Sequence, residues 1–273
     1  MTPKKNFLRS AAAAPHIVWA VLFIVAPLLF VIYYAFTDSD GGFTFDNITS
    51  LADYSETFLL SVCFAMIATV ACLLVAYPLA YAISRTGART QRVLLMLAML
   101  PMWMTYSMLA ILDDGGFVNR LLTSIGLPEM HFIGTPGAVI FGMVYNFFPY
   151  MLLPIYTTMS KMDTRLIEAA QDLGCNAFGV LRNVIFPLSA SGVLSGVTMV
   201  FVPSISTFYI SQKLGGGTFD LIGDTIERQF QRPDTYNVGA AISLVMMILI
   251  LISIAIMNHF AGDGENASGG MIV

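Results

Sequence analysis

Long apolar runs separated by short polar segments make up most of this chain. Six runs have about the 20 residues that a helix needs to cross a bilayer: Ile17–Phe36, Phe58–Ile83, Val93–Leu112, Gly137–Tyr156, Pro187–Ile210 and Val238–Met257. No Lys, Arg, Asp or Glu falls inside a run. Because a charge at the centre of a membrane helix costs roughly 2.5–3.5 kcal/mol, the pattern predicts an all-α polytopic membrane protein with six transmembrane helices.

The segments between these runs predict the orientation of the chain. Basic residues gather in the N-terminal tail and in residues 84–92, whereas residues 37–57 carry five acids and no base. Because Lys and Arg favour the cytoplasmic side of a membrane, we predict that both termini lie inside and that the loops alternate across the bilayer. Residues 211–237, with three bases on the predicted outer side, are the exception. The first run is interpreted as an uncleaved span, since no small-x-small cleavage site follows it.

These spans predict how the chain is organised. A cytoplasmic tail (residues 1–16) precedes the first transmembrane helix and its outer loop (17–57). A core of five helices follows (58–257), interrupted by a cytoplasmic loop (157–186), and a cytoplasmic tail (258–273) ends the chain. Composition supports a membrane protein, because 11% of the residues are charged, against about 25% in soluble domains.

Motifs of catalysis, nucleotide binding and metal binding are absent from the sequence. It has no G-x-x-x-x-G-K-S/T, H-E-x-x-H or G-x-S-x-G motif, and its three histidines and three cysteines are scattered. The predicted spans also lack the intramembrane charges that proton-driven carriers commonly use as relays. We therefore predict a chain that is not an enzyme, has no cofactor or metal of its own and takes its energy from elsewhere.

A polar, amphipathic stretch interrupts the apolar pattern between Lys161 and Pro187. Asp163 is predicted to cap a helix, Gly174 to end it, and Asn176 to cap a second short helix before a span begins at Pro187. The first helix has two opposite stripes: an apolar one of Leu166, Ile167, Ala170 and Leu173, and a charged one of Arg165, Glu168 and Asp172. Taken alone, this pattern also fits an amphipathic helix lying on the membrane surface.

The spacing within this stretch is long and specific. Glu168-Ala169-Ala170 is followed after three residues by Gly174, and after nine more by Val184-Ile185-Phe186-Pro187. This resembles the E-A-A-x3-G-x9-I-x-L-P loop of bacterial ABC importer permeases. The resemblance implies a type I ABC importer permease fold and a coupling helix that sits in a groove of a separate ATPase subunit, where ATP and Mg²⁺ bind. The residues that it assigns to coupling are Glu168, Ala169, Ala170, Asp172 and Gly174.

Other stretches are similar to permeases of spermidine/putrescine importers. They are Tyr77-Pro78-Leu79-Ala80-Tyr81, Leu100-Pro101-Met102-Trp103, Tyr145-Asn146-Phe147-Phe148-Pro149-Tyr150, Leu153-Pro154-Ile155-Tyr156, Gly215-Gly216-Gly217, Leu221-Ile222-Gly223-Asp224 and Gln229-Phe230. The resemblance implies a polyamine importer in the bacterial cytoplasmic membrane, with a second homologous permease as heterodimer partner, two ATPase subunits, an external polyamine-binding protein and no nucleic acid. The segment after Trp103 is shorter than in that family.

Two alternatives stay open at this point. Permeases for sulfate, molybdate or iron share the architecture, and a secondary carrier or channel would work without ATP. An anion pathway should offer Lys or Arg, and none lies in the predicted spans.

Aromatic faces and acids at the mouth can hold a linear polycation. The candidate pathway residues are Trp103, Tyr106, Tyr145, Phe148, Tyr81 and Asp224. Each aromatic also has a plainer role open to it, because Tyr and Trp often anchor helix ends at the membrane interface and Phe often packs. A separate pattern, Gly192-x-x-x-Gly196, predicts close packing between two helices.

Overall fold

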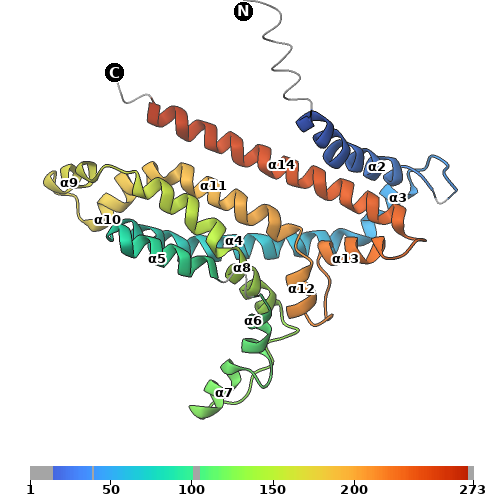
Figure 1. Ribbon diagram of the computed structural model, residues 1–273, viewed down its shortest axis with the longest axis horizontal. Coiled ribbons are helices and arrows are strands. Elements are labelled where there is room, and N and C mark those ends of the chain that lie inside the picture. Colours follow the sequence, from blue (N-terminus) through green and yellow to red (C-terminus); the bar gives the residue numbers. More distant parts are fainter. Residues whose placement is uncertain (1–14, 39, 101–104, 270–273) are drawn as a thin grey trace, which may run out of the picture. The chain divides into compact units, whose positions relative to one another are not determined.

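The computed structural model describes residues 15–38, 40–100 and 105–269, with the side chains of residues 105, 106 and 260–269 outside the description (Figure 1). Its regular structure over these residues is helical, apart from one isolated antiparallel bridge between Thr37 and Phe43. The described chain therefore has the all-α fold that the apolar pattern predicts.

The helices are, in chain order and with the labels of Figure 1, α2 (Ala26–Ala35), α3 (Asp46–Thr49), α4 (Ser55–Ser84), α5 (Ala88–Met99), α6 (Thr105–Leu112), α7 (Phe117–Ser124), α8 (Pro136–Ser160), α9 (Thr164–Asp172), α10 (Ala177–Val180), α11 (Phe186–Ile205), α12 (Tyr209–Leu214), α13 (Ile222–Phe230) and α14 (Tyr236–Gly269). A 3₁₀ helix, Ser50–Tyr54, joins α3 to α4, and π-helical turns at Val21–Val25 and Leu181–Ile185 lead into α2 and α11.

Within the described ranges, five helices are long and apolar enough to cross a membrane. They are Pro15–Ala35, Asp46–Ser84, Pro136–Ser160, Ala177–Ile205 and Tyr236–His259. These helices confirm the first, second, fourth, fifth and sixth predicted spans, with changes at some ends.

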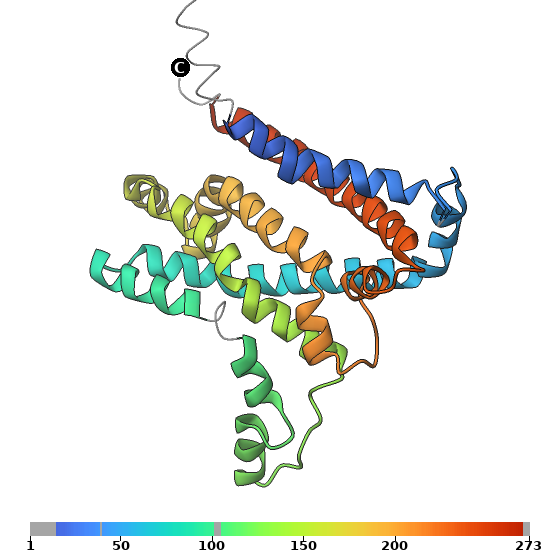
Figure 2. The same ribbon diagram turned by 45° about the vertical axis from the view of Figure 1, so that its right-hand side comes forward.

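The predicted third span, Val93–Leu112, does not form one straight helix. α5 ends at Met99 after 12 residues, α6 begins at Thr105 and has 8 residues, and the two run in different directions (Figures 1 and 2). Each is shorter than the roughly 20 residues that span a bilayer core. Residues 101–104 of the predicted span lie outside the described residues.

The predicted fifth span is wrong at both ends. One helix runs from Ala177 to Ile205, so the second short helix expected after Asn176 is the first part of the span itself. The predicted end, Ile210, instead belongs to α12.

A π-helical turn explains how this helix passes Pro187. Phe186 donates its amide hydrogen to the carbonyl of Leu181, five residues back, which widens the turn just before a residue that has no amide hydrogen to donate. The first membrane helix repeats the arrangement, because Ala26 donates to Val21 just before Pro27. The two prolines are thus accommodated without ending their helices.

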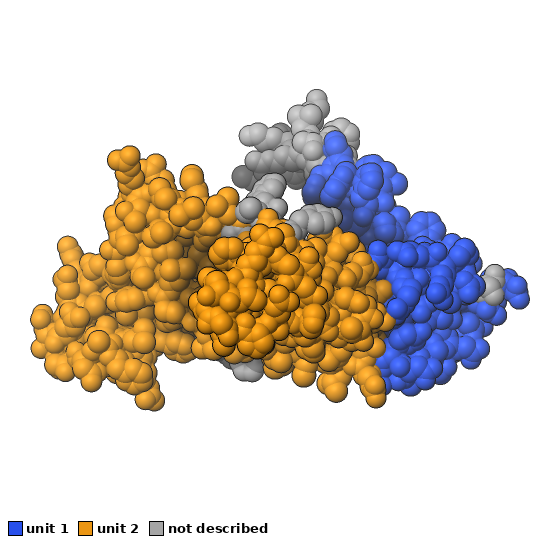
Figure 3. Space-filling model, turned by 90° about the horizontal axis from the view of Figure 1, so that it is seen from below, with its two compact units in different colours: residues 1–55, 225–249 blue, residues 56–224, 250–273 orange. Residues whose placement is uncertain are grey.

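The chain divides into two compact units, residues 1–55 with 225–249 (unit 1) and residues 56–224 with 250–273 (unit 2), coloured separately in Figure 3. In unit 1, α2 lies along the beginning of α14 (Figures 1 and 2). The core between them consists of Ala35, Ala240, Ala241 and Leu244. Three alanines at this contact allow the two backbones to approach closely.

In unit 2, α8 and α11 form the central helix pair. A Cβ atom added at Gly192 would come within 2.5 Å of Thr158 Oγ1 and 2.8 Å of the Pro154 carbonyl oxygen, and one at Gly196 within 2.8 Å of Met151 Sδ. The G-x-x-x-G pattern is thus confirmed as a packing motif, because only glycine leaves room for this approach.

α4 has one buried face of small residues and one exposed face of large apolar residues. The buried face contains Ala65, Ala68, Cys72, Ala76 and Ala80. The exposed face contains Met66, Ile67, Val70, Leu74 and Val75. An exposed apolar surface of this kind marks contact with lipid or with another apolar helix.

Candidate functional site

The loop between α8 and α11 is shaped by local hydrogen bonds to the backbone. The carboxylate of Asp163 accepts a bond from the amide of Arg165 at 3.0 Å, at the start of α9. The side-chain oxygen of Asn176 accepts one from the amide of Gly179 at 2.8 Å, at the start of α10. Both predicted caps are confirmed, and each satisfies an amide that the first turn of a helix leaves unbonded.

Gly174 ends α9 in a left-handed conformation, with φ of 85°. The amide of Gly174 donates to the carbonyl of Gln171 at 2.8 Å, and the amide of Cys175 donates to the carbonyl of Ala170 at 3.1 Å. These two bonds form a Schellman motif, the helix ending that favours glycine at this position. The predicted role of Gly174 as a helix terminator is confirmed.

The apolar stripe of α9 is split between the inside and the outside of the loop. Ile167 is buried and Ala170 half-buried, whereas Leu166 is 48% exposed and Leu173 is 86% exposed. Leu173 follows the last helical residue, and at 100° per residue it lies about 240° around the axis from Ile167. The predicted apolar stripe therefore does not form one buried face.

The outward surface of the loop combines carboxylates with apolar side chains. Glu168, Ala169 and Asp172 of the predicted coupling set are exposed, and Phe178 is 68% exposed close by in the sequence. α9 and α10 lie at one end of unit 2 (Figure 1). Exposed large apolar residues such as Leu173 and Phe178 are typical of interaction surfaces. Sequence reasoning assigned Leu173 to the apolar stripe without showing that it is exposed, and it gave Phe178 no role.

A cavity of about 470 Å³ lies between this loop and α4. Tyr77 and Tyr81 of α4 line it together with Ile167 and Gln171 of α9. The guanidinium of Arg85 lies 5.2 Å from the centre of the Tyr81 ring, within the range of a cation–π contact. Tyr81, a predicted pathway residue, thus lies beside the predicted coupling loop.

Two further pathway candidates lie together on α8. Tyr145 and Phe148 are three residues apart and half-buried against the core of unit 2, so they share one side of the helix. Trp103 lies outside the described residues, and so does the side chain of Tyr106.

Asp224 lies buried in the first turn of α13, with 5% of its surface exposed. Its Oδ2 accepts a hydrogen bond from the amide of Leu221 at 2.9 Å. The neighbouring amide of Ile222 donates to the hydroxyl of Ser61 on α4 at 2.8 Å. About 30 Å of helix separates Ser61 from Tyr81 at 1.5 Å per residue. Asp224 and Tyr81 therefore lie near opposite ends of α4, not in one pocket.

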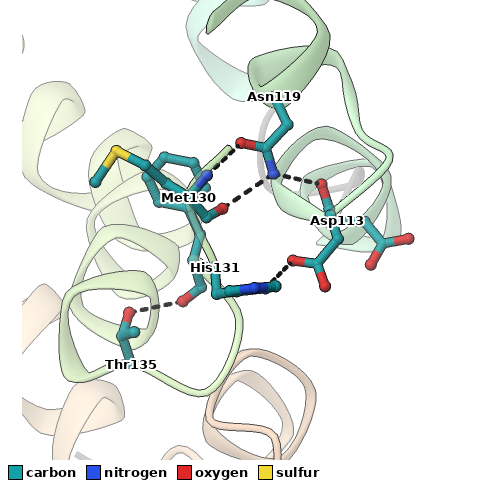
Figure 4. Close-up of polar contacts among 7 residues, drawn as sticks. Asp113, Asn119, Met130, His131 and Thr135 are labelled. Atoms are coloured by element: carbon teal, nitrogen blue, oxygen red, sulfur yellow. Dashed lines mark hydrogen bonds and ion pairs between the residues drawn. The ribbon is translucent and has the colours of Figure 1, made fainter. Parts of the chain in front are cut away.

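The connection from α6 to α8 contains side-chain bonds that the sequence did not single out. Asn119 is buried, donates from Nδ2 to the carbonyl of Met130 at 3.0 Å and accepts from the amide of Met130 at 3.0 Å (Figure 4). His131 Nδ1 lies 2.8 Å from Asp114 Oδ1, with both side chains exposed. Because a carboxamide can donate and accept at the same time, the buried Asn119 ties α7 to the backbone of Met130.

Comparisons with known proteins agree with this architecture. Residues 76–262 match the family described as "Binding-protein-dependent transport system inner membrane component". The chain is 34% identical over 247 residues to the spermidine/putrescine transport system permease protein PotB of Escherichia coli (strain K12), covering 85% of this chain and 90% of that protein. It is 33% identical over 251 residues to PotB of Haemophilus influenzae, covering 86% of this chain and 88% of that protein.

A solved structure shares the fold. It is the crystal structure of a bacterial ABC transporter involved in the import of the acidic polysaccharide alginate, with a TM-score of 0.75 at 17% identity, covering 95% of this chain and 96% of that one. The family match over α8, the loop and α11 assigns the long apolar helices to a transport subunit of the bacterial inner membrane. The chain therefore belongs to the family of inner membrane components of binding-protein-dependent transport systems, the permeases of ABC importers.

Proposed function

We propose that the chain is the membrane-spanning permease of an ATP-driven importer for polyamines such as spermidine and putrescine. The observation that carries the proposal is the 34% identity, over 85% of the chain, to a permease named for these cargoes. The charge distribution supports a cationic cargo. Arg182 is the one Lys or Arg in the five long helices described, whereas a pathway for sulfate or molybdate should offer several cationic groups.

The loop around α9 is proposed to transmit the motion of the ATPase. Glu168, Ala169 and Asp172 present a low, acidic surface, Gly174 fixes its end, and Ala170 joins it to the core of unit 2. A complementary groove on an ATPase would cover the exposed Leu173. Burial of apolar surface of this kind is the main driving force of most protein–protein contacts. ATP and Mg²⁺ would bind on that partner, so this chain needs no cofactor.

The chain is proposed to work within a larger assembly. A second homologous permease would form a heterodimer with it, two ATPase subunits would supply the energy, and an external polyamine-binding protein would deliver the cargo. The exposed apolar face of α4, with residues such as Leu74 at 70% exposure, supports a partner helix or lipid along this side. No nucleic acid is involved.

The loop around α9 is proposed to face the cytoplasm, with both termini on the same side of the bacterial cytoplasmic membrane. Basic residues support this orientation, because Arg85, Arg89 and Arg92 follow α4 and Lys161 follows α8. The Tyr156 hydroxyl near the end of α8 donates to the side chain of Gln91 at 2.9 Å. The two basic segments are thus close together, which supports their placement on one side of the membrane, and their Lys and Arg favour the cytoplasmic side.

The cargo is proposed to pass the aromatic side chains of Tyr145 and Phe148, with Tyr81 towards the coupling loop and Asp224 towards the opposite end of α4. Trp103 and Tyr106 complete the proposed set. Cation–π contacts with such rings contribute about 0.5–2 kcal/mol each, which is weak enough to allow release.

The test is uptake of labelled spermidine into proteoliposomes that contain the permease with its ATPase, its partner permease and the binding protein. Glu168→Lys should reduce uptake at least about tenfold, a factor worth about 1.4 kcal/mol, while membrane insertion stays intact. Glu129→Lys, at an exposed acid of the α7–α8 connection, is the matched control. ATP-independent uptake would instead indicate a secondary carrier, and uptake of sulfate, molybdate or iron alone would assign a different cargo.

A further inference from the structure

A surface pocket in unit 1 lies outside the proposed coupling loop and pathway. Its volume is about 470 Å³, and it sits where the first membrane helix ends and α14 begins. The side chains relevant to its chemistry are Tyr33, Tyr34, Thr37, Asp38, Tyr236 and Asn237. In the proposed orientation this end of both helices is the outer surface of the membrane.

Three tyrosine rings meet at this pocket. The centroid of Tyr34 lies 5.0 Å from that of Tyr236 and 5.5 Å from that of Tyr33, with the rings at 77° in each pair. Tyr33 is 55% exposed and Tyr236 is 39% exposed. Because edge-to-face pairs hold rings at steep angles to each other, the pocket offers π faces in more than one direction.

The pocket is preformed by hydrogen bonds. The carbonyl of Thr37 accepts from the side-chain amides of Asn237 at 2.6 Å and Asn47 at 2.9 Å. The hydroxyl of Thr37 donates to the carbonyl of Tyr33 at 2.6 Å, and the amide of Asp38 donates to the carbonyl of Gly42 at 2.8 Å. The short hairpin that carries Asp38 is thereby tied to the ends of both membrane helices.

The charge at the pocket is negative. Asp38 lines it, and Asp40 and Asp234 are exposed on the same two segments, next to one base, Arg232. A carboxylate among tyrosine rings is the arrangement that recognises an ammonium group, through an ionic contact together with cation–π contacts. An anionic ligand would meet carboxylates here.

We propose that this pocket binds the ammonium end of a linear amine at the outer surface of the membrane. The carboxylate of Asp38 contacts the charge, and the faces of Tyr33 and Tyr236 cover the charge and the adjoining methylene groups. The site is separate from the pathway residues of unit 2 and acts as a weak capture point for the cargo. The role of the pocket in capturing the cargo rests on the proposed polyamine transport. The binding of an amine to the pocket does not depend on that proposal.

The experiment uses the full chain in lipid nanodiscs, without ATPase or binding protein. A butylammonium probe that carries a diazirine should crosslink to residues 33–41 or 233–237, and unlabelled spermidine and butylamine should compete for this labelling while butanol does not. Asp38→Asn and Tyr33→Leu should each weaken spermidine competition about five- to tenfold, as expected for loss of one ionic or cation–π contact. Asp53→Asn, at an exposed acid of the Ser50–Tyr54 helix, and Tyr33→Phe should change it less than about twofold, because the first lies outside the pocket and the second keeps the ring.

The possible results separate this proposal from the transport proposal. Labelling elsewhere, or unchanged competition in Asp38→Asn and Tyr33→Leu, overturns the pocket even where the full complex imports spermidine. Amine-specific labelling at the pocket in a complex that imports another solute supports the pocket and overturns polyamine transport. A single monodisperse chromatographic peak for each variant verifies that it is folded, and Tyr33→Leu, at an exposed side chain, serves where Asp38→Asn fails this control.

Discussion

The proposed coupling loop and the α8–α11 contact are neighbours along the chain but are held together by different physical means. Bonds in the loop join near neighbours, such as Asn176 with Gly179 and Cys175 with Ala170. The α8–α11 contact joins distant residues, such as Gly192 with Pro154, through the close fit of two helices. The loop therefore keeps its shape by itself, while the helix pair depends on interlocking surfaces.

This difference has a consequence for transport. The loop is attached to α8 at one end and, through the continuous helix from Ala177, to α11 at the other. Because the two helices are locked together at Gly192 and Gly196, a force on the loop reaches them as a pair. Substitutions at the helix contact should therefore reduce the stability of the protein most, and substitutions in the loop should reduce it less.

The largest expected loss of stability is at the helix contact. Gly192→Ala places a methyl group within 2.8 Å of a backbone carbonyl that cannot move without shifting α8, and overpacking of this kind costs about 3 kcal/mol. The control is Gly137→Ala in α8, where the nearest atom lies 3.9 Å away. Denaturation of the full chain by SDS should show a large difference between the two, and equal midpoints would contradict the packing role.

A smaller loss is expected at the end of α9. An alanine at Gly174 meets no atom within 4 Å, so its only penalty is the left-handed backbone at φ 85°, about 1–2 kcal/mol. Gly42→Ala, also without a neighbour within 4 Å but without a positive φ, should have little effect. Uptake should fall in Gly174→Ala, because the tilt of α9 changes; normal uptake would argue against its role in coupling.

Short-range features of this structure could be predicted from the sequence. The caps at Asp163 and Asn176 and the ending at Gly174 depend on residues within one helical turn, so the local pattern contains all the information needed. The long helices could be predicted because a helix that crosses the hydrocarbon core of a bilayer must consist almost entirely of apolar residues. The same local signals, however, cannot show which side of α9 is covered, since that depends on α4, far away in the sequence.

Sequence reasoning missed a rare backbone geometry and a contact between distant segments. Pro187 suggests a helix start, and a π-helical turn is needed to carry the helix past it. Asp224 suggests an open acid in a loop, but the Ser61 hydroxyl on α4 binds the adjacent segment and helps to bury it. In each case a contact or a rare backbone geometry overrides the local preference. The local shape of the loop was therefore predictable from the sequence, whereas the burial of Asp224 was not.

The N-terminal cap of α10 should contribute less than the glycine ending. Asn176→Ala removes the acceptor for the Gly179 amide, which costs about 1 kcal/mol for a typical cap. Asn183→Ala is the matched control, because Asn183 lies at an exposed position of the same continuous helix and does not cap it. It should shift the SDS midpoint less. A shift of equal size in both variants would show that the hydrogen bond of Asn176 contributes nothing to stability.

The smallest effect on stability is expected at Leu173. A substitution there distinguishes the contribution of this side chain to folding from its contribution to binding the ATPase. With 86% of its surface exposed, Leu173→Ser should change the free energy of unfolding by no more than about 0.5 kcal/mol. If an ATPase covers this side chain, the lost burial of about 1.5–3 kcal/mol weakens its binding roughly tenfold or more. Leu127→Ser, in the α7–α8 connection and 50% exposed, should leave that binding unchanged. Titration of the purified ATPase onto nanodiscs containing each variant measures the difference. Unchanged affinity in Leu173→Ser would mean that Leu173 lies outside the docked surface, which would leave Phe178 and the carboxylates of Glu168 and Asp172 as the groups that hold the ATPase.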